Sequence, residues 1–152
     1  MITPLLTFSL IAHVILGIIA VAASYAVWLE LIKKSPSVSF LKKSSLISFF
    51  SYLFSWFSGG YYYVVYYGDI QKPKIVAGAY PWAHKIFTEA KEHIFLFLPF
   101  AALALLIVIW KMNQDLSQNE GLRKGAVFLA GSITVLGLLI ALAGIIISGA
   151  VR

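Results

Sequence analysis

Three histidines and a few carboxylates are the side chains in this sequence best suited to chemistry. His13 lies inside a long apolar run, whereas His93 lies in the segment TEAKEHIFLFLP, one helical turn after Glu89. Glu92 directly precedes His93, and His84 lies nine residues before it. Imidazole is an axial ligand of haem iron, and two imidazoles with one carboxylate suit zinc, iron, copper or manganese. The sequence therefore contains two overlapping candidate sites.

The first hypothesis is a single haem b with His13 and His93 as its two axial ligands. Gly59 and Gly60 would leave room for the edge of the macrocycle, because glycine has no side chain. Phe97 lies one turn after His93 on the same helix face and would pack on the macrocycle. This hypothesis predicts a redox protein that carries out electron transfer.

The second hypothesis is a transition-metal site that serves metal binding or transport. Its ligands are His13, Glu89 and His93, with Glu92 and His84 as further ligands. A third interpretation assigns no cofactor: the charged groups around His93 lie in water at a membrane interface, His13 forms a structural hydrogen bond, and the chain is a non-catalytic accessory subunit. His84 is about half a turn out of phase with His93, so we expect it to be exposed or a secondary ligand.

The composition indicates which elements must position these residues. The chain has 152 residues, of which 61% are hydrophobic and 12% charged, whereas soluble domains are about half apolar and about a quarter charged. Apolar runs cover about 5–29, 46–67, 82–110 and 125–151, and about 20 helical residues cross a bilayer. We therefore expect one all-α domain over residues 1–152, an integral membrane four-helix up-and-down bundle. The absence of cysteine excludes thiolate and iron–sulfur sites.

The loops between these runs carry most of the positive charge. The first and third loops hold seven basic residues, and the opposite side holds five, counting Arg152. The positive-inside rule then places both termini outside, in a bacterial or archaeal cell membrane. Because the bases flank apolar runs, we expect them to contact lipid and not nucleic acid.

Small and hydroxyl side chains form a regular stripe along the second apolar run. Steps of three and four residues place this stripe on one helix face, which we expect to pack against other helices. Assembly into an oligomer is a separate expectation for a membrane protein of this kind. The stripe consists of Ser44, Ser48, Ser51, Ser55, Ser58 and Tyr62. His13 lies 20 residues from Lys33, and His93 lies 18 residues from Lys111, so both lie roughly 27–30 Å from the basic boundary. In an up-and-down bundle the first and third helices are diagonal neighbours, which would let the two histidines face each other.

The run IAHVILGIIAVAASYAVW around His13 resembles the first span of small histidine-bearing four-helix membrane proteins. These include b-type cytochromes and copper-resistance-D-type proteins. The resemblance implies haem or copper handling through His13 and His93. In the haem hypothesis, a quinol or a redox partner subunit would exchange electrons with the site. Only three histidines are present, so the resemblance implies at most one bis-histidine haem.

Overall fold

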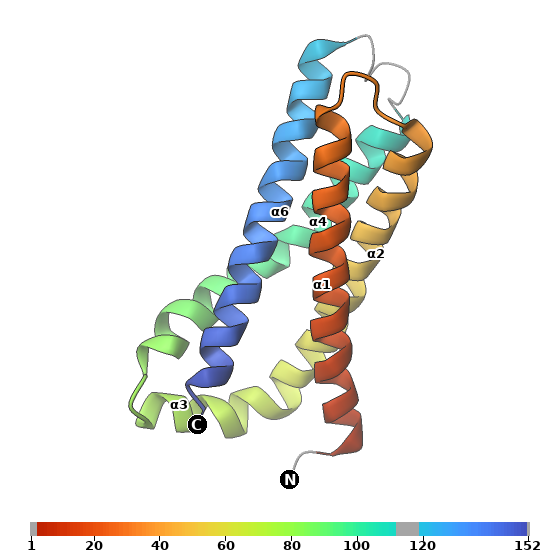
Figure 1. Ribbon diagram of the computed structural model, residues 1–152. Coiled ribbons are helices and arrows are strands. Elements are labelled where there is room, and N and C mark those ends of the chain that lie inside the picture. The colour runs from red at the N-terminus through yellow and green to blue at the C-terminus, as the bar shows by residue number, and fades with distance from the viewer. Residues whose placement is uncertain (1–2, 112–118, 152) are drawn as a thin grey trace.

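Helices make up nearly all of the part of the chain that the computed structural model describes, residues 3–111 and 119–151, and no strand occurs in these ranges. Two of the helices, η1 and η2, have the wider π-helical hydrogen-bond pattern. In chain order the elements are α1 (Pro4–Ile32), α2 (Val38–Tyr62), η1 (Tyr63–Gln71), α3 (Lys72–Ala77), η2 (Ala83–Thr88), α4 (Glu89–Lys111) and α6 (Glu120–Gly149) (Figure 1).

Polar side chains fix where three of the long helices begin. The Thr3 hydroxyl accepts a hydrogen bond from the backbone N–H of Leu6 at 3.3 Å, and Pro4 follows in the first turn of α1. Ser37 caps α2 through the same kind of bond, and the Asn119 side chain caps α6. Such caps satisfy backbone donors that have no partner within the helix. The polar residues just before these apolar runs thus determine where the three helices begin.

The four long helices lie side by side in a square arrangement. Helix α1 packs against α2 and α6, and α4 packs against the same two helices. Helices α1 and α4 are therefore diagonal, as the sequence predicted. The buried apolar core is built from all four, with Val27, Leu41, Leu105 and Ile133 among its members.

The connections lie at two opposite ends of the molecule. The α1–α2 turn and the start of α6 lie at one end, whereas both chain ends and the segment from η1 to η2 lie at the other (Figure 1). The up-and-down order predicted for the helices is therefore confirmed for the described residues. The α1–α2 turn, the end of α4 and the start of α6 share one end, and residues 112–118 of the third predicted loop and Arg152 fall outside the described part.

The segment between the second and third apolar runs was predicted to be a loop, but it is largely helical. The structure continues α2 into η1 and α3, and only a short stretch before η2 is non-helical. Its Ile75 is fully buried among Tyr62, Tyr67 and Ile147. This burial explains why a polar-looking segment folds into helix: a few apolar side chains anchor it against the ends of α2 and α6.

Three helices are long and apolar enough to cross a membrane. They are Pro4–Ile32, the continuous stretch Ala83–Lys111 and Glu120–Gly149. The expected start of the third run near residue 82, ahead of its purely apolar part, is confirmed. The second predicted span does not meet the same criterion, because its serines and tyrosines lower its mean hydropathy.

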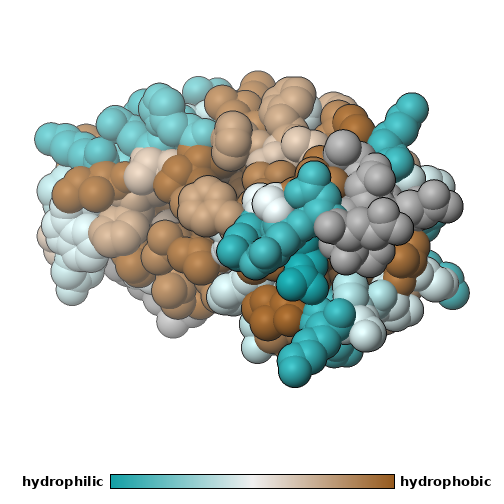
Figure 2. All heavy atoms as spheres, turned by 90° about the horizontal axis from the view of Figure 1, so that it is seen from above, coloured by the Kyte–Doolittle hydropathy of each residue, from teal (hydrophilic) through white to brown (hydrophobic). Residues whose placement is uncertain are grey.

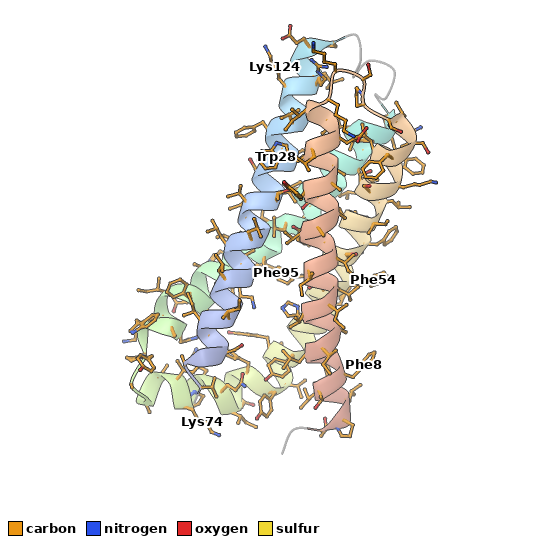
Figure 3. All side chains as sticks on the ribbon, in the orientation of Figure 1. Phe8, Trp28, Phe54, Lys74, Phe95 and Lys124 are labelled. Carbon is orange, nitrogen blue, oxygen red and sulfur yellow. The ribbon has the colours of Figure 1, made fainter. Side chains whose placement is uncertain are left out.

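The outer surface of the helices is strongly apolar. Phe8, Phe54 and Phe128 are all exposed, and the first two point away from the bundle in Figure 3. Figure 2 looks onto the end with the α1–α2 turn and shows hydrophilic residues there, with hydrophobic side chains along the flanks. This exposed apolar surface is more extensive than the apolar patches that a soluble monomer normally exposes.

Candidate functional site

Helices α1 and α2 are joined by hydroxyl groups that bond to backbone carbonyls across the interface. The Ser9 hydroxyl donates to the carbonyl oxygen of Ser58 at 2.6 Å, and the Ser48 hydroxyl donates to that of Ala20 at 3.4 Å. Ser55 donates to the carbonyl oxygen of His13 at 3.0 Å. The stripe predicted on the second run is therefore confirmed as a packing face, with Ser44, Ser48, Ser51, Ser55 and Tyr62 all buried.

His13 lies in this interface, and Ser55 contacts its Nδ1 through two oxygen atoms. Its Nδ1 lies 2.9 Å from the Ser55 carbonyl oxygen and 3.1 Å from the Ser55 hydroxyl. A carbonyl oxygen can only accept a hydrogen bond, so Nδ1 carries the proton. In the neutral ring, Nε2 then has the free lone pair. This is the tautomer in which an imidazole binds a metal through Nε2 while Nδ1–H is oriented by a backbone carbonyl.

Gly59 is required for this position of the His13 ring. A Cβ atom on Gly59 would lie 2.4 Å from Nδ1 and 2.7 Å from Cε1 of His13. The space that Gly59 leaves is thus filled by the imidazole itself, whereas the sequence predicted room for a macrocycle. Phe95 of α4 meets the ring edge-on, with ring centroids 5.6 Å apart. The imidazole is therefore enclosed by groups from α1, α2 and α4.

A lysine lies close to this imidazole. Lys91 of α4 is partly buried, and its charge acts on His13. Its Nζ lies 3.5 Å from where a Cβ on Gly144 of α6 would be, so the ammonium group lies beside α6. Within residues 3–111 and 119–151, no carboxylate lies within ion-pair distance of Lys91. The interior beside His13 therefore carries positive charge without a paired anion.

Glu92 lies next along α4, and its Oε1 atom is buried. No residue in the described ranges forms a hydrogen bond with this oxygen. Tyr63 of η1 lies near this carboxylate. These two groups add an acid and a hydroxyl to the polar interior.

The other predicted ligands on α4 face outward. His93 is exposed, and its Nδ1 donates to the carbonyl oxygen of Glu89, 2.7 Å away. Glu89 and Phe97 are exposed as well, and Gly60 has open space around it. The structure therefore does not bring His93 to His13. Residues 91 and 95 point inward, and His93 lies between them on the opposite helix face because successive residues are about 100° apart.

His84 is buried, contrary to the expectation that it would be exposed. Its side chain is 5% exposed, and its Nδ1 lies 3.1 Å from the Tyr67 hydroxyl. That hydroxyl also lies 2.8 Å from the Thr88 hydroxyl, which donates to the carbonyl oxygen of Ala83. His84 thus joins η1 to η2 in a polar contact. In the described ranges, no three His, Asp or Glu side chains form a group that could hold a metal ion.

Sequence reasoning missed Lys91 and Phe95 as neighbours of His13, whereas the structural hydrogen bond that the third interpretation assigned to His13 is present, with Ser55 as its partner. Helical periodicity could have linked Lys91 to Phe95, because these residues are one turn apart and lie on the same face of α4. A partly buried lysine at the edge of an apolar run is also unusual. Helix α4 directly follows η2, which packs against α6. The sequence alone carried no signal for that contact.

These features define an all-helical protein with three helices capable of crossing a membrane and an oriented histidine inside the helix packing. The sequence matches no protein-family model, and neither a curated protein nor a solved structure is detectably similar to it.

Proposed function

We propose that this chain is an integral membrane protein whose four long helices all cross the bilayer. Helix α2 supports this despite its low mean hydropathy, because its serines face the protein and its outer face is apolar. The outer residues Ile47, Phe50, Phe54 and Phe57 are all exposed and recur at steps of three and four, as on one face of a helix. The basic end would then be cytoplasmic, with both termini outside.

Within this bundle, we propose a redox site that holds one haem b through His13, near the outer face. The observation that carries this proposal is the hydrogen bond between Nδ1 of His13 and the Ser55 carbonyl, 2.9 Å long. It fixes the ring orientation and leaves Nε2 as the ligating nitrogen, the arrangement typical of an axial imidazole. A haem bound there would supply one-electron transfer, and its electron partner would be a quinol or a neighbouring redox subunit.

The positive charge of Lys91 suits an anionic cofactor, whereas the buried carboxylate of Glu92 next to it on α4 does not. Lys91 lacks an ion-pair partner in the described ranges, and burying part of an ammonium group without such a partner is costly. A propionate-bearing group would supply the missing negative charge. The donors fit one axial imidazole; they do not fit the bis-histidine pair, because His93 is exposed on the far face of α4.

A transition-metal ion has less support than haem. The metal hypothesis needs His13, Glu89 and His93 to converge, and the described residues contain no such group. Elemental analysis of the purified protein tests it directly. A stoichiometric metal without a haem absorbance would replace the haem proposal with the metal one.

The deciding measurement is the absorbance spectrum of protein purified from haem-replete cells and of the same protein titrated with hemin. We expect a Soret band in the wild type and in His93→Gln, and its loss in His13→Gln. His93→Gln is the matched control, since it makes the same side-chain change at an exposed imidazole on the far face of α4. A protein that gains no Soret band under either condition overturns the proposal.

Replacing His13 with glycine provides a second test, which does not require the site to tolerate a glutamine side chain. His13→Gly leaves space beside Gly59, and added imidazole should enter it and restore the band. Circular dichroism and gel filtration confirm that each variant is folded. Persistence of the wild-type spectrum in His13→Gly without imidazole would assign the ligand elsewhere and remove His13 from the site.

A further inference from the structure

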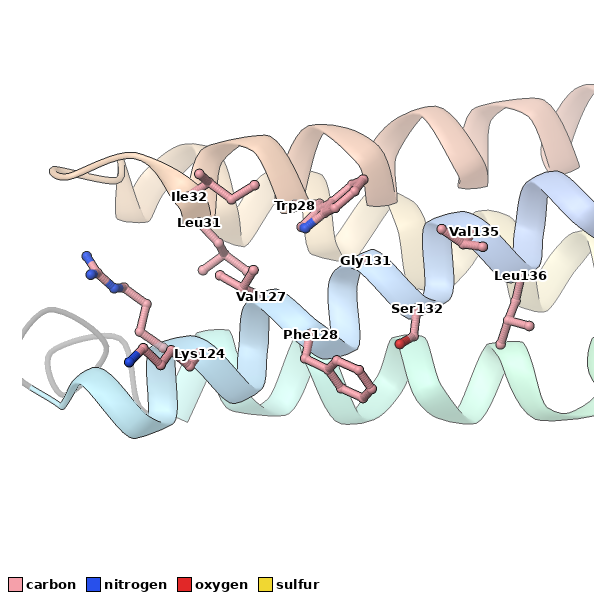
Figure 4. Close-up of a pocket in the computed structure, with 11 residues that line it drawn as sticks. Trp28, Leu31, Ile32, Lys124, Val127, Phe128, Gly131, Ser132, Val135 and Leu136 are labelled. Carbon is pink, nitrogen blue, oxygen red and sulfur yellow. The ribbon is translucent and has the colours of Figure 1, made fainter.

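An apolar groove runs between α1 and α6, at the end of the molecule opposite His13. Its volume is about 750 Å³, within the range of about 300–1,000 Å³ typical of small-molecule sites. Trp28 and Ile32 of α1 and Phe128 and Val135 of α6 form part of its walls (Figure 4). Ile32, Phe128 and Val135 are exposed in the described structure, so the groove is open to the surroundings of the bundle.

Gly131 makes this groove possible. A Cβ atom on Gly131 would lie 3.1 Å from Cε2 and from Nε1 of Trp28. The indole therefore lies directly on the backbone of α6, and its ring edge forms part of the floor. A larger residue at 131 would push the indole outward into the space that an occupant would fill.

Positive charge is concentrated at one end of the groove. Arg123 and Lys124 line that end, in the first turns of α6. Lys124 is paired with Glu120 at 2.9 Å. Arg123 has no carboxylate within ion-pair distance among the described residues. The groove thus combines an apolar trough with one available guanidinium group at its mouth, and guanidinium binds phosphate through two parallel hydrogen bonds.

The length of the groove fits a single membrane leaflet. From Arg123 to Leu136 it follows 13 residues of α6, about 20 Å at the helical rise. Half of a bilayer core is about 15 Å thick. An occupant with a phosphate at Arg123 and an acyl chain along the groove would therefore reach from the headgroup layer to the bilayer centre.

We infer that this groove is a binding site for one anionic phospholipid of the leaflet at the basic end. The phosphate lies at Arg123, and one acyl chain lies along Trp28 and Phe128. This site is separate from the haem proposal and depends only on the membrane location. Basic residues at the cytoplasmic ends of spans commonly select anionic headgroups, and here the apolar groove below them gives the chain a defined place.

Trp28 provides a direct readout of occupancy. A full-length variant with Trp56, Trp82 and Trp110 changed to phenylalanine retains Trp28 as its only tryptophan. It is reconstituted into vesicles of phosphatidylcholine that contain increasing fractions of dibrominated phosphatidylglycerol or dibrominated phosphatidylcholine. Bromine quenches indole fluorescence on contact. We expect the anionic lipid to bind about fivefold more strongly, the factor that one basic residue at a membrane surface typically supplies.

Charge variants identify the headgroup contact. Arg123→Gln should abolish the preference for the anionic lipid, and Arg123→Lys should retain most of it. Lys74→Gln is the control, because it makes the same charge change at the opposite end of the molecule (Figure 3). Equal quenching by the two lipids in the wild type would overturn the proposal. So would the absence of quenching by either lipid, which would show that protein covers the groove.

Discussion

Changing Gly59 to alanine tests the arrangement around His13 with a single methyl group. The added Cβ would lie 2.4 Å from His13 Nδ1, well inside van der Waals contact. The ring would have to move away from Ser55, and the 2.9 Å bond to the Ser55 carbonyl would break. The variant therefore perturbs the imidazole, although it changes neither the charge nor any hydrogen-bonding side chain.

The expected loss of stability follows from three effects. Overpacking typically costs about 1–3 kcal/mol, and leaving a buried polar group unpaired costs about 1–3 kcal/mol. Alanine is a better helix former than glycine by about 0.8–1.0 kcal/mol, which offsets part of this cost. We expect a net loss of about 3 kcal/mol in the free energy of unfolding, which corresponds to a lowering of Tm by about 6–12 °C for a chain of this size.

Thermal unfolding in detergent, followed by tryptophan fluorescence, measures this loss. Gly60→Ala is the matched control, because a Cβ at residue 60 meets no atom within 4 Å. It should be neutral or stabilising by up to about 1 kcal/mol. Combining Gly59→Ala with His13→Ala should recover about 1–3 kcal/mol of coupling. If Gly59→Ala and Gly60→Ala unfold at the same temperature, His13 does not occupy the space beside Gly59.

Three further substitutions probe other contacts in the same way. Ser55→Ala removes the hydroxyl that bonds to His13 and should cost about 1 kcal/mol in thermal unfolding; an unchanged Tm would count against the α1–α2 hydrogen bonds. Gly137→Ala places a Cβ 2.5 Å from the Tyr52 hydroxyl and should cost about 1–3 kcal/mol, with partial recovery in Tyr52→Phe. Tyr67→Phe removes the hydroxyl beside buried His84 and should speed proteolysis and amide hydrogen exchange within residues 63–88. Equal rates in the variant and the wild type would refute that contact.

The fold was more predictable than the site because the sequence patterns that indicate the helices recur at many positions. The apolar runs and the serine stripe each rest on several residues at regular steps, so a single exception does not alter the prediction. The length of the third helix and the diagonal placement of α1 and α4 followed from the same patterns. The η1–α3 segment was missed because its burial depends mainly on Ile75 and a few tyrosines, which form no periodic pattern.

The site depended on single residues and on the rotation of one helix. His93 and Lys91 are two residues apart on α4, and a rotation of about 160° exchanges their directions. Both are polar residues near the end of an apolar run, so hydropathy does not distinguish them. The structure turns Lys91 and Phe95 toward His13 and leaves His93 exposed. Gly59 was correctly identified as a position where space matters, although the group that fills the space is His13.

The serine stripe connects the fold to the site through helix register. A side-chain hydrogen bond between membrane helices contributes on average only about 0.6 kcal/mol, so these bonds add little stability individually. They do require specific partners: Ser9 bonds to Ser58, Ser48 to Ala20, and Ser55 to His13. A shift of α1 by one residue would move His13 by about 1.5 Å and turn it by about 100°, which would remove it from Ser55 and from the space at Gly59. The stripe therefore matters most because it sets the register of α1 against α2, and that register orients Nε2 of His13.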